Sequence, residues 1–311
     1  MGEIERKLAS LKKMLRMGKF EYSEIQESLG VDYKYARKLI QMLRDSGTPV
    51  EATYYKGRKQ FWIPPMDPSP GVGEYHIEIP VKDGRYSFAV IACTHIGSYY
   101  TQEDNLNKFY DILEERGIKT VLHCGDLFEG VKGSSRPRQL NEIKIYGYSK
   151  MLDYGVEFYP KRKGIKTYAI TGNHDDWYWD LVGANILKNF ADLRDDVVYL
   201  GMQYAELTIN KNKAVMQHGG GSANVYAKSY KLQKYLDGMR ERPDFYFLAH
   251  YHKTAYMPYN GTNAYLVGTW KDGDLHSRSI PGGADVGGWI ITVNVDKKGK
   301  IKSVVSEWVG F

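Results

Sequence analysis

Apolar residues in the N-terminal segment recur every three or four positions, which is the spacing of an amphipathic helix. The pattern predicts one helix at residues 3–17 and another at residues 33–45. Between them, Ser23 and Gln26 form the pattern of a capping box, which predicts a short helix that ends at Gly30. We therefore expect three short helices at the start of the chain.

The next segment, residues 50–64, alternates between apolar and polar residues. Alternation on both sides of Lys56-Gly57 predicts a β-hairpin whose turn contains this dipeptide. Three helices followed by a hairpin is the element order of a winged helix-turn-helix. We predict that small domain for residues 1–65.

The stretch PPMDPSPGVG then interrupts the pattern, and its proline and glycine content predicts a linker. We assign residues 66–85 to this linker and a lead-in strand. Beyond it, short apolar runs alternate with helical patterns, so residues 86–311 are predicted to form an α/β layered domain. The expected strands and helices lie at residues 85–93, 102–116, 119–124, 138–153, 165–171, 205–217, 244–250 and 263–269, with a final hairpin at 287–309.

The charge of the chain is distributed unevenly. Its 311 residues have a net charge of +6, and residues 1–63 alone contain 13 Lys and Arg against 8 Asp and Glu. A solvated basic face is the ordinary explanation, but the excess also suits an anionic partner. We predict DNA as that partner, and contact with a second copy of the chain, giving a homodimer, is the alternative. The predicted DNA contacts are Lys34, Arg37, Lys38, Lys56, Arg58 and Lys59.

Other features of the composition bear on the compartment. No apolar run reaches the roughly 18 residues of a membrane span, and the charged N-terminus does not have the pattern of a signal peptide. The two cysteines, Cys93 and Cys124, suit a reducing compartment better than a disulfide framework. We expect a cytoplasmic protein without membrane contact.

Residues able to bind metal ions follow several of the predicted strands. Carboxyl ends of strands line the ligand crevice of open α/β sheets, so we expect these side chains to converge. Asp, Asn and His together supply the mixed nitrogen and oxygen ligands of a pair of divalent metal ions. The residues in these motifs are Cys93, His95, Asp126, Asn173, His174, Asp175, His218, His250 and His252.

Taken in order, the motifs CTH, GD, GNHD, H and AHYH resemble the signature of the calcineurin-like metallophosphoesterases, which reads D-x-H, G-D, G-N-H-D/E, H and G-H-x-H. The resemblance covers about residues 86–270. With its GDLFEG motif and basic N-terminal module, the chain is most similar to the branch that contains the double-strand-break repair nucleases. The resemblance implies a four-layer αββα sandwich, here preceded by the predicted winged helix.

The resemblance also implies roles for the individual residues. His95, Asp126 and His252 would bind one metal ion, and Asp126 would bridge to a second ion. Asn173, His218 and His250 would complete the second site. His174 would act on the phosphate or the leaving oxygen, with Asp175 orienting it. Mn²⁺ is the expected activator in vitro, and Zn²⁺, Fe²⁺ and Ni²⁺ are alternatives.

The chain departs from the signature at Cys93, where the family has an aspartate, and at Ala249, where it has a glycine. Cys93 could bind the first metal as a thiolate, stand beside a weak first site, or pair with Cys124. Thiolates are poor ligands for Mn²⁺ and good ones for zinc or iron. We therefore expect the first site to bind Mn²⁺ more weakly than the second, or to prefer another metal.

These observations predict a metal-dependent phosphodiesterase that acts on nucleic acid as a nuclease and is brought to DNA by its N-terminal module. Two metal ions would neutralise the phosphodiester anion, which otherwise repels nucleophiles. One alternative is a phosphomonoesterase or nucleotide phosphatase with the same core. Another is a DNA-binding regulator whose metal site has decayed, for which Cys93 is the supporting feature.

Overall fold

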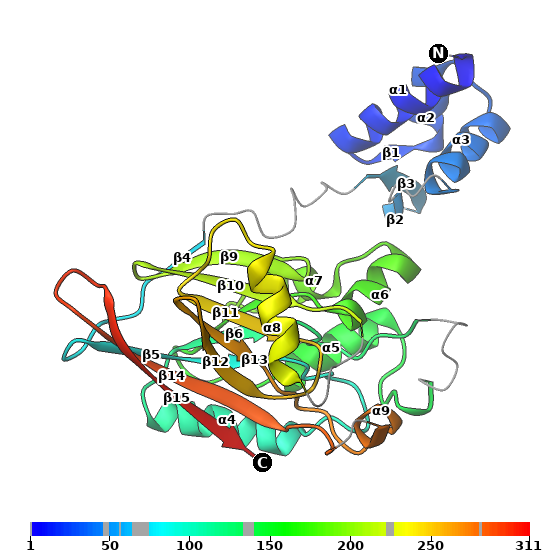
Figure 1. Ribbon diagram of the computed structural model, residues 1–311. Helices are drawn as coiled ribbons and strands as arrows, with labels where there is room; N and C mark the ends of the chain where they lie inside the picture. The colour runs from blue at the N-terminus through cyan, green and yellow to red at the C-terminus, as the bar shows by residue number, and fades with distance from the viewer. Residues whose placement is uncertain are drawn as a thin grey trace. The chain divides into compact units, whose positions relative to one another are not determined.

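The computed structural model describes residues 2–45, 50–55, 57–63, 75–132, 140–221, 227–279 and 282–311. Residue contacts divide the chain into two compact units, Met1–Ser69 and Pro70–Phe311, which are described separately below (Figure 1). Lys56 and the proline-rich part of the predicted linker lie outside the described residues.

The N-terminal unit combines helices with a small antiparallel sheet whose strand order is β1-β3-β2. The helices bury one apolar face each against this sheet, and the shared core includes Leu15, Ile25, Leu39 and Phe61. The elements are α1 (Glu3–Met17), β1 (Phe20–Glu21), α2 (Tyr22–Leu29), α3 (Tyr33–Asp45), β2 (Glu51–Tyr55) and β3 (Arg58–Trp62).

The start of α2 differs from the sequence-based prediction of a capping box at Ser23. Glu21 is the N-cap residue, and its backbone N–H donates to the Glu24 carboxylate at 2.7 Å. Pairing of β1 with β3 extends to Glu21, so the chain passes directly from strand to helix and leaves no room for a later cap. The predicted stop at Gly30 is confirmed, because Gly30 adopts a left-handed C-cap conformation.

The C-terminal unit contains two six-stranded sheets. The first has the order β15-β14-β5-β6-β7-β8, and the second has the order β12-β13-β11-β10-β9-β4. The first sheet consists of β5 (Arg85–Ile91), β6 (Thr120–Cys124), β7 (Lys166–Ile170), β8 (Val197–Gly201), β14 (Gly287–Val295) and β15 (Ile301–Gly310). The second consists of β4 (Tyr75–Ile77), β9 (Tyr204–Ile209), β10 (Asn212–His218), β11 (Phe245–Ala249), β12 (Ala255–Tyr259) and β13 (Thr262–Leu266).

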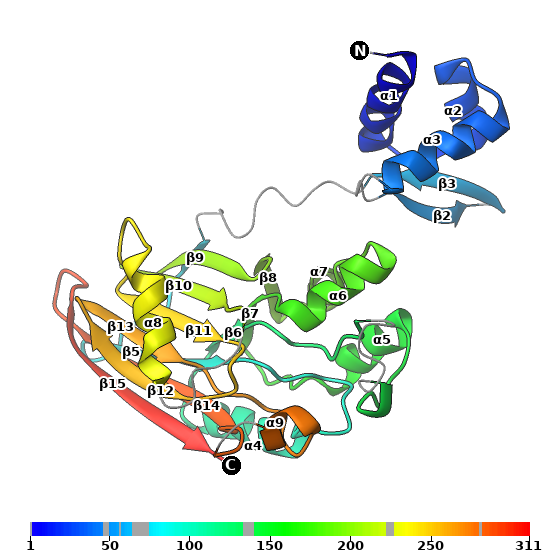
Figure 2. The ribbon, with the colours of Figure 1, turned by 45° about the vertical axis from the view of Figure 1, so that its right-hand side comes forward.

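Helices cover the outer faces of both sheets (Figure 2). The alternation of side chains along each strand explains the layers, because successive residues point to opposite faces. On β5, Phe88 and Val90 enter the core between the sheets, whereas Ala89 and Ile91 pack under the helices. The helices are α4 (Glu103–Glu115), α5 (Tyr148–Phe158), α6 (Asn173–Val182), α7 (Ile186–Leu193), α8 (Lys228–Asp237) and α9 (Leu275–Ser279).

The layer order confirms the predicted αββα sandwich. One core lies between the two sheets, a second lies between the first sheet and helices α4, α5, α6 and α7, and a third lies between the second sheet and α8. None of the helices in the described part of the chain is long and apolar enough to cross a membrane.

Two predicted elements have different boundaries in the structure. The helix expected at residues 138–153 begins only at Tyr148, because Gly147 has φ 101° and Ile143 forms a bridge with Ser98. The strand expected at residues 205–217 is two antiparallel strands, β9 and β10, joined by a turn in which Asn210 has φ 54°.

Candidate metal centre

The motif residues lie where strands end, and many have unusual backbone conformations. Among the described residues, five of the nine non-glycine residues with positive φ belong to these motifs. Left-handed conformations cost free energy in residues other than glycine, and they persist where the surrounding structure enforces them. The residues are Cys93 (φ 52°), His95 (47°), Asp126 (55°), His250 (91°) and His252 (52°). Strain is therefore concentrated at one end of the sandwich.

Glycines in the GD and GNHD motifs allow the strand ends to approach one another. A Cβ atom at Gly172 would lie 2.2 Å from Oδ1 of Asp126, and a Cβ atom at Gly125 would lie 2.5 Å from Nδ1 of His218. Such contacts are shorter than real Cβ atoms make, so glycine is required at both positions.

The predicted ligands of the second site converge around the His218 imidazole. Its Nε2 atom lies 3.2 Å from Oδ2 of Asp126, 3.2 Å from Oδ1 of Asn173 and 3.3 Å from Nδ1 of His250. Nδ1 of His218 donates to the Cys124 carbonyl at 2.9 Å, which leaves Nε2 with a lone pair facing the cluster.

The predicted ligands of the first site lie beside this cluster. Nε2 of His95 is 3.3 Å from Nε2 of His252 and 3.8 Å from Oδ2 of Asp126. Cys93 is fully buried, and its sulfur lies within 4.8 Å of the ligand atoms of His95 and His252. The sulfur also lies within 4.8 Å of the ligand atoms of Asp126 and His218, so Cys93 borders both sites. Cys93 and Cys124 are both free thiols.

The donor sets fit divalent metal ions. Ligand atoms around an ion with bonds of about 2.0–2.2 Å are separated by roughly 3.0–3.4 Å, and the pairs at His218 have this separation. Imidazole nitrogens that face each other at 3.3 Å need a proton or a cation between them. Burial and the neighbouring His218 lower the pKa of His250 to about 4, so its ring is neutral and able to bind a metal at neutral pH.

The cluster also sets the charge of its central carboxylate. Burial acts to raise the pKa of Asp126, but His218, His174 and His95 outweigh it and hold that pKa well below its usual range. Burial lowers the pKa of His95, which keeps this imidazole neutral. Asp126 is thus an anion beside the neutral imidazoles of His95 and His250, and a carboxylate anion is a ligand able to bridge two metal ions.

The environment of His174 corrects the predicted role of Asp175. The Asp175 carboxylate accepts hydrogen bonds from the backbone N–H groups of Leu127, Phe128 and Gly172 at 2.8–3.1 Å, so it fastens the GDLFEG loop to the start of α6. Glu129 holds the His174 imidazole instead, with Oε1 accepting from Nδ1 at 2.8 Å. Asp175 therefore shapes the site through the backbone and does not orient the His174 ring.

Glu129 and Lys271 are functional candidates that the sequence did not reveal. Glu129 is fully buried, and its Oε2 lies 3.2 Å from Nδ1 of His95 and 2.9 Å from Nζ of Lys271. Lys271 also pairs with Glu142 at 3.1 Å and with Asp274 at 3.0 Å. The acidic residue in GDLFEG was a signal for Glu129, whereas Lys271 lies in a segment without a recognisable motif.

Aromatic residues directly follow the GNHD motif on α6. Trp177 and Tyr178 are buried, so they pack inside the domain. The Trp177 ring lies 4.0 Å from the His174 ring, and the Tyr178 hydroxyl donates to the Glu129 carbonyl. Both residues therefore support the position of His174 and Glu129.

The predicted DNA contacts lie in the N-terminal unit. Lys34, Arg37 and Lys38 are exposed on α3, opposite the face that buries Leu39 and Leu43. Arg58 and Lys59 are exposed on β3, where Arg58 pairs with Glu21 at 3.5 Å and Lys59 lies 5.5 Å from the Phe61 ring. An exposed pair of this length is weak and leaves Arg58 able to exchange partners.

The fold and the two ligand clusters define a metal-dependent phosphoesterase. Residues 87–275 match the model of the calcineurin-like phosphoesterase superfamily domain, and the chain belongs to this family. The family depends on divalent metal ions, and its domain is that of a hydrolase acting on phosphate esters. No curated protein matches the sequence.

Several solved structures are similar to the C-terminal unit. A novel archaeal phosphodiesterase is 13% identical, with 72% of this chain and 99% of that chain covered and a TM-score of 0.41. Vps29 of Entamoeba histolytica complexed with zinc is 14% identical, with 72% and 98% covered and a TM-score of 0.37. A predicted phosphoesterase of Streptococcus pneumoniae is 11% identical, with 73% and 98% covered and a TM-score of 0.36.

Proposed function

We propose that the protein is a metal-dependent phosphodiesterase that cleaves nucleic acid, and that its N-terminal unit brings it to DNA as a winged helix. The observation that carries the catalytic part is the convergence of Asp126, Asn173, His218 and His250 beside His174. His174 is tied to this cluster through its backbone N–H, which donates to Oδ1 of Asp126 at 2.8 Å.

The chain's own residues would divide the reaction between them. Metal ions bound by the two clusters would neutralise the phosphate and lower the pKa of water. Asp126 orders the site, because its two oxygens contact His218 on one side and the start of α6 on the other. Glu129 accepts a hydrogen bond from Nδ1 of His174, so Nε2 is the atom that would donate a proton to the leaving oxygen.

The DNA part of the proposal is supported by the exposed basic side chains of α3. Three helices and a hairpin pack as a separate unit, and Lys34, Arg37 and Lys38 lie on the face of α3 that its own core does not use. A helix that presents several cations to solvent suits the phosphates of a duplex.

We also propose Mn²⁺ as the activating metal in vitro, since the second cluster offers carboxylate, amide and imidazole donors.

The first experiment compares bis-p-nitrophenyl phosphate with the monoester p-nitrophenyl phosphate after addition of Mn²⁺, Zn²⁺, Fe²⁺ or Ni²⁺. A phosphodiesterase will turn over the diester faster, a phosphomonoesterase will prefer the monoester, and a regulator with a decayed site will hydrolyse neither. Single-stranded and double-stranded DNA are then tested with the best metal.

The matched variants are Asp126→Asn and Asp192→Asn. Asp126→Asn removes the central anion and is expected to lower kcat for the diester by at least about a thousandfold, a loss typical of an essential electrostatic group. Asp192 is exposed on α7, so the same substitution there should leave turnover unchanged. Normal turnover by folded Asp126→Asn protein would refute the proposed mechanism.

A further inference from the structure

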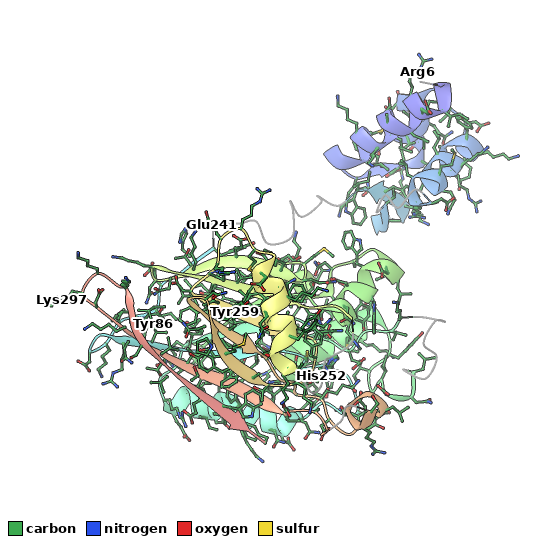
Figure 3. The ribbon with its side chains drawn as sticks, in the orientation of Figure 1. Arg6, Tyr86, Glu241, His252, Tyr259 and Lys297 are labelled. Atoms are coloured by element: carbon green, nitrogen blue, oxygen red, sulfur yellow. The ribbon has the colours of Figure 1, made fainter. Side chains whose placement is uncertain are left out.

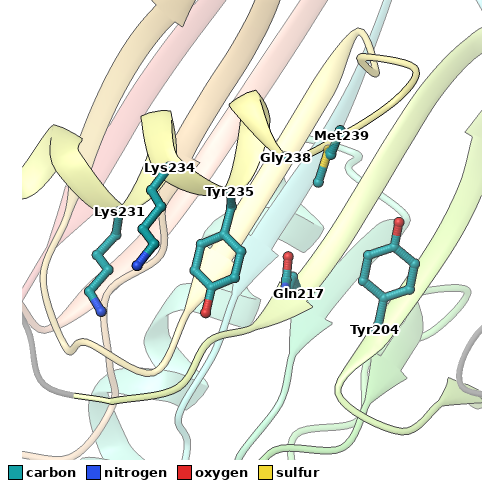
Figure 4. A pocket seen from close by; sticks show the side chains of 7 residues that line it. All are labelled: Tyr204, Gln217, Lys231, Lys234, Tyr235, Gly238 and Met239. Carbon is teal, nitrogen blue, oxygen red and sulfur yellow. The ribbon is translucent and has the colours of Figure 1, made fainter.

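A basic and aromatic pocket lies between α8 and the outer face of the second sheet. It has a volume of about 380 Å³, which is within the usual range for pockets that bind small ligands. Figure 4 shows Lys231, Lys234 and Tyr235 extending side by side from α8, with Gln217 between Tyr235 and Tyr204. The pocket is lined by Tyr204, Gln217, Lys231, Lys234, Tyr235, Gly238 and Met239.

The chain directly links this pocket to the metal ligands. Gln217 precedes His218 on β10 and pairs in register with Tyr204 on β9. The backbone N–H of Gly220, two residues after His218, donates to the Tyr235 hydroxyl at 3.4 Å. Lys231 lies over the ring of Tyr251, which stands between His250 and His252. The pocket therefore adjoins the segment that follows His218, through Tyr235 and Gly220.

The pocket offers charges that the protein does not neutralise. Lys228 of α8 pairs with Asp285 at 3.3 Å. Among the residues that the structure describes, neither Lys231 nor Lys234 forms an ion pair with a carboxylate. Two ammonium groups one helical turn apart, at positions i and i+3, suit an anion that bridges them, such as a phosphodiester.

The remaining groups suit a nucleobase. Oε1 of Gln217 accepts from the Tyr246 hydroxyl at 2.7 Å, so the amide NH₂ is left to donate to a carbonyl acceptor. The Tyr204 hydroxyl donates to Glu206 at 2.7 Å, which fixes the ring at the edge of the pocket. Aromatic faces beside cations are the combination that single-stranded nucleic acid binds, through stacking and phosphate contacts.

We propose that this pocket binds one nucleotide of the substrate strand, with its phosphate at Lys231 and Lys234 and its base against the Tyr204 ring and the Gln217 amide. The inference rests on the proposed function, because it assigns a nucleic-acid strand to the metal centre. The subsite lies outside the metal ligands. Its residues give the enzyme a higher affinity for a nucleotide chain than for a small diester.

The test uses the full chain and the double variant Lys231→Ala/Lys234→Ala. Tetrathymidylate is measured as a competitor of bis-p-nitrophenyl phosphate hydrolysis, and its direct binding is measured by calorimetry. The double variant should bind tetrathymidylate roughly tenfold more weakly, while kcat/KM for the small diester stays unchanged. The matched control, Lys297→Ala/Lys298→Ala, removes the same charge from the turn between β14 and β15, away from His252 (Figure 3).

Equal affinity of the double variant and the control for tetrathymidylate would overturn the subsite. If the double variant loses affinity for inorganic tripolyphosphate by the same tenfold, the proposed base contact is overturned, because loss of charge alone would explain the weaker binding. If the tenfold loss is specific to tetrathymidylate but no DNA is cleaved under any metal condition, the pocket stands and the nuclease proposal fails. If DNA is cleaved normally by the double variant with unchanged affinity, the nuclease proposal stands and the pocket fails.

Discussion

At the scale of single residues, Cys93 is the departure from the family signature that bears on metal choice. It is fully buried, and burial together with the nearby Asp126 raises the pKa of its thiol well above the usual range. Thiolate sulfur is a poor partner for the hard Mn²⁺ ion, so we expect a first site that binds Mn²⁺ weakly.

Replacement of Cys93 by aspartate should strengthen the first site for Mn²⁺. Aspartate places a hard oxygen beside His95 and His252, and it tolerates the left-handed conformation at this position better than most residues. Mn²⁺ content should rise toward two ions per chain and kcat should rise with it, since changes beside metal ligands commonly shift metal affinity or activity by about 10–100-fold. Cys93→Ser is the control of similar size and should change little. Loss of metal and of turnover in Cys93→Ser would mean that the thiolate is a required ligand.

Glu129 is predicted to position His174 and His95 together. Glu129→Gln keeps the size of the side chain but weakens its hydrogen bond with the imidazole, so kcat should fall about 10–100-fold. The loss should be largest for diesters with poor leaving groups, and His174→Asn should show the same dependence. A double variant should lose no more than His174→Asn alone.

Glu142→Gln is the matched control for Glu129. Glu142 also contacts Lys271, but it does not belong to the pairs that hold the two imidazoles. Replacement of Glu142 should not change how kcat depends on the leaving group of the diester. Equal effects of Glu129→Gln and Glu142→Gln on kcat would show that the two glutamates act only through the stability of the fold.

At the scale of elements, periodicity predicted the regular parts of the fold. Helices α1 and α3 occupy the predicted residues because a continuous apolar face is buried in each. The errors occurred where long-range pairing or a turn decided the boundary. β1 pairing moved the start of α2, and positive φ angles at Gly147 and Asn210 divided segments that looked continuous. The pairing of β1 with β3 depends on residues distant in sequence and leaves no local pattern, whereas the two turns are local features.

In the candidate site too, some features were predictable from the sequence and others were not. Motif order located every residue of the two ligand clusters, because strand ends in a layered α/β fold meet at one edge. The role of Asp175 could not be read from adjacency to His174, since a residue at the start of a helix can cap it with its side chain. Lys271 was missed because two of its three carboxylate partners, Glu129 and Glu142, lie far from it in the sequence.

The basic face of α3 should contribute to DNA binding through phosphate contacts. Arg37→Ala/Lys38→Ala removes two exposed cations, so affinity should fall and the slope of log K against log salt should decrease in magnitude by about 2. The control Arg6→Ala/Lys13→Ala removes the same charge from exposed positions on α1. Fluorescence anisotropy over a salt series measures the DNA affinity and the salt slope of each variant. Identical slopes for the two variants would exclude α3 as the contacting helix.

At the scale of the whole molecule, the division into two units predicts that catalysis and DNA affinity can be separated. The C-terminal unit contains both ligand clusters and the cores that support them, and β4 completes its second sheet from Tyr75 onward. A chain that starts at Pro70 therefore retains every residue proposed for chemistry. We expect it to hydrolyse bis-p-nitrophenyl phosphate with the kcat of the full chain.

The same shortened chain should bind duplex DNA at least about tenfold more weakly, because it lacks the excess positive charge of residues 1–63. Thermal unfolding and metal content establish that the shortened protein is intact before the rates are compared. Analytical ultracentrifugation of both chains tests the other partner proposed for the module. A full chain that is dimeric, with a monomeric shortened form and unchanged DNA affinity, would assign residues 1–63 to self-association and remove the DNA-recruitment proposal.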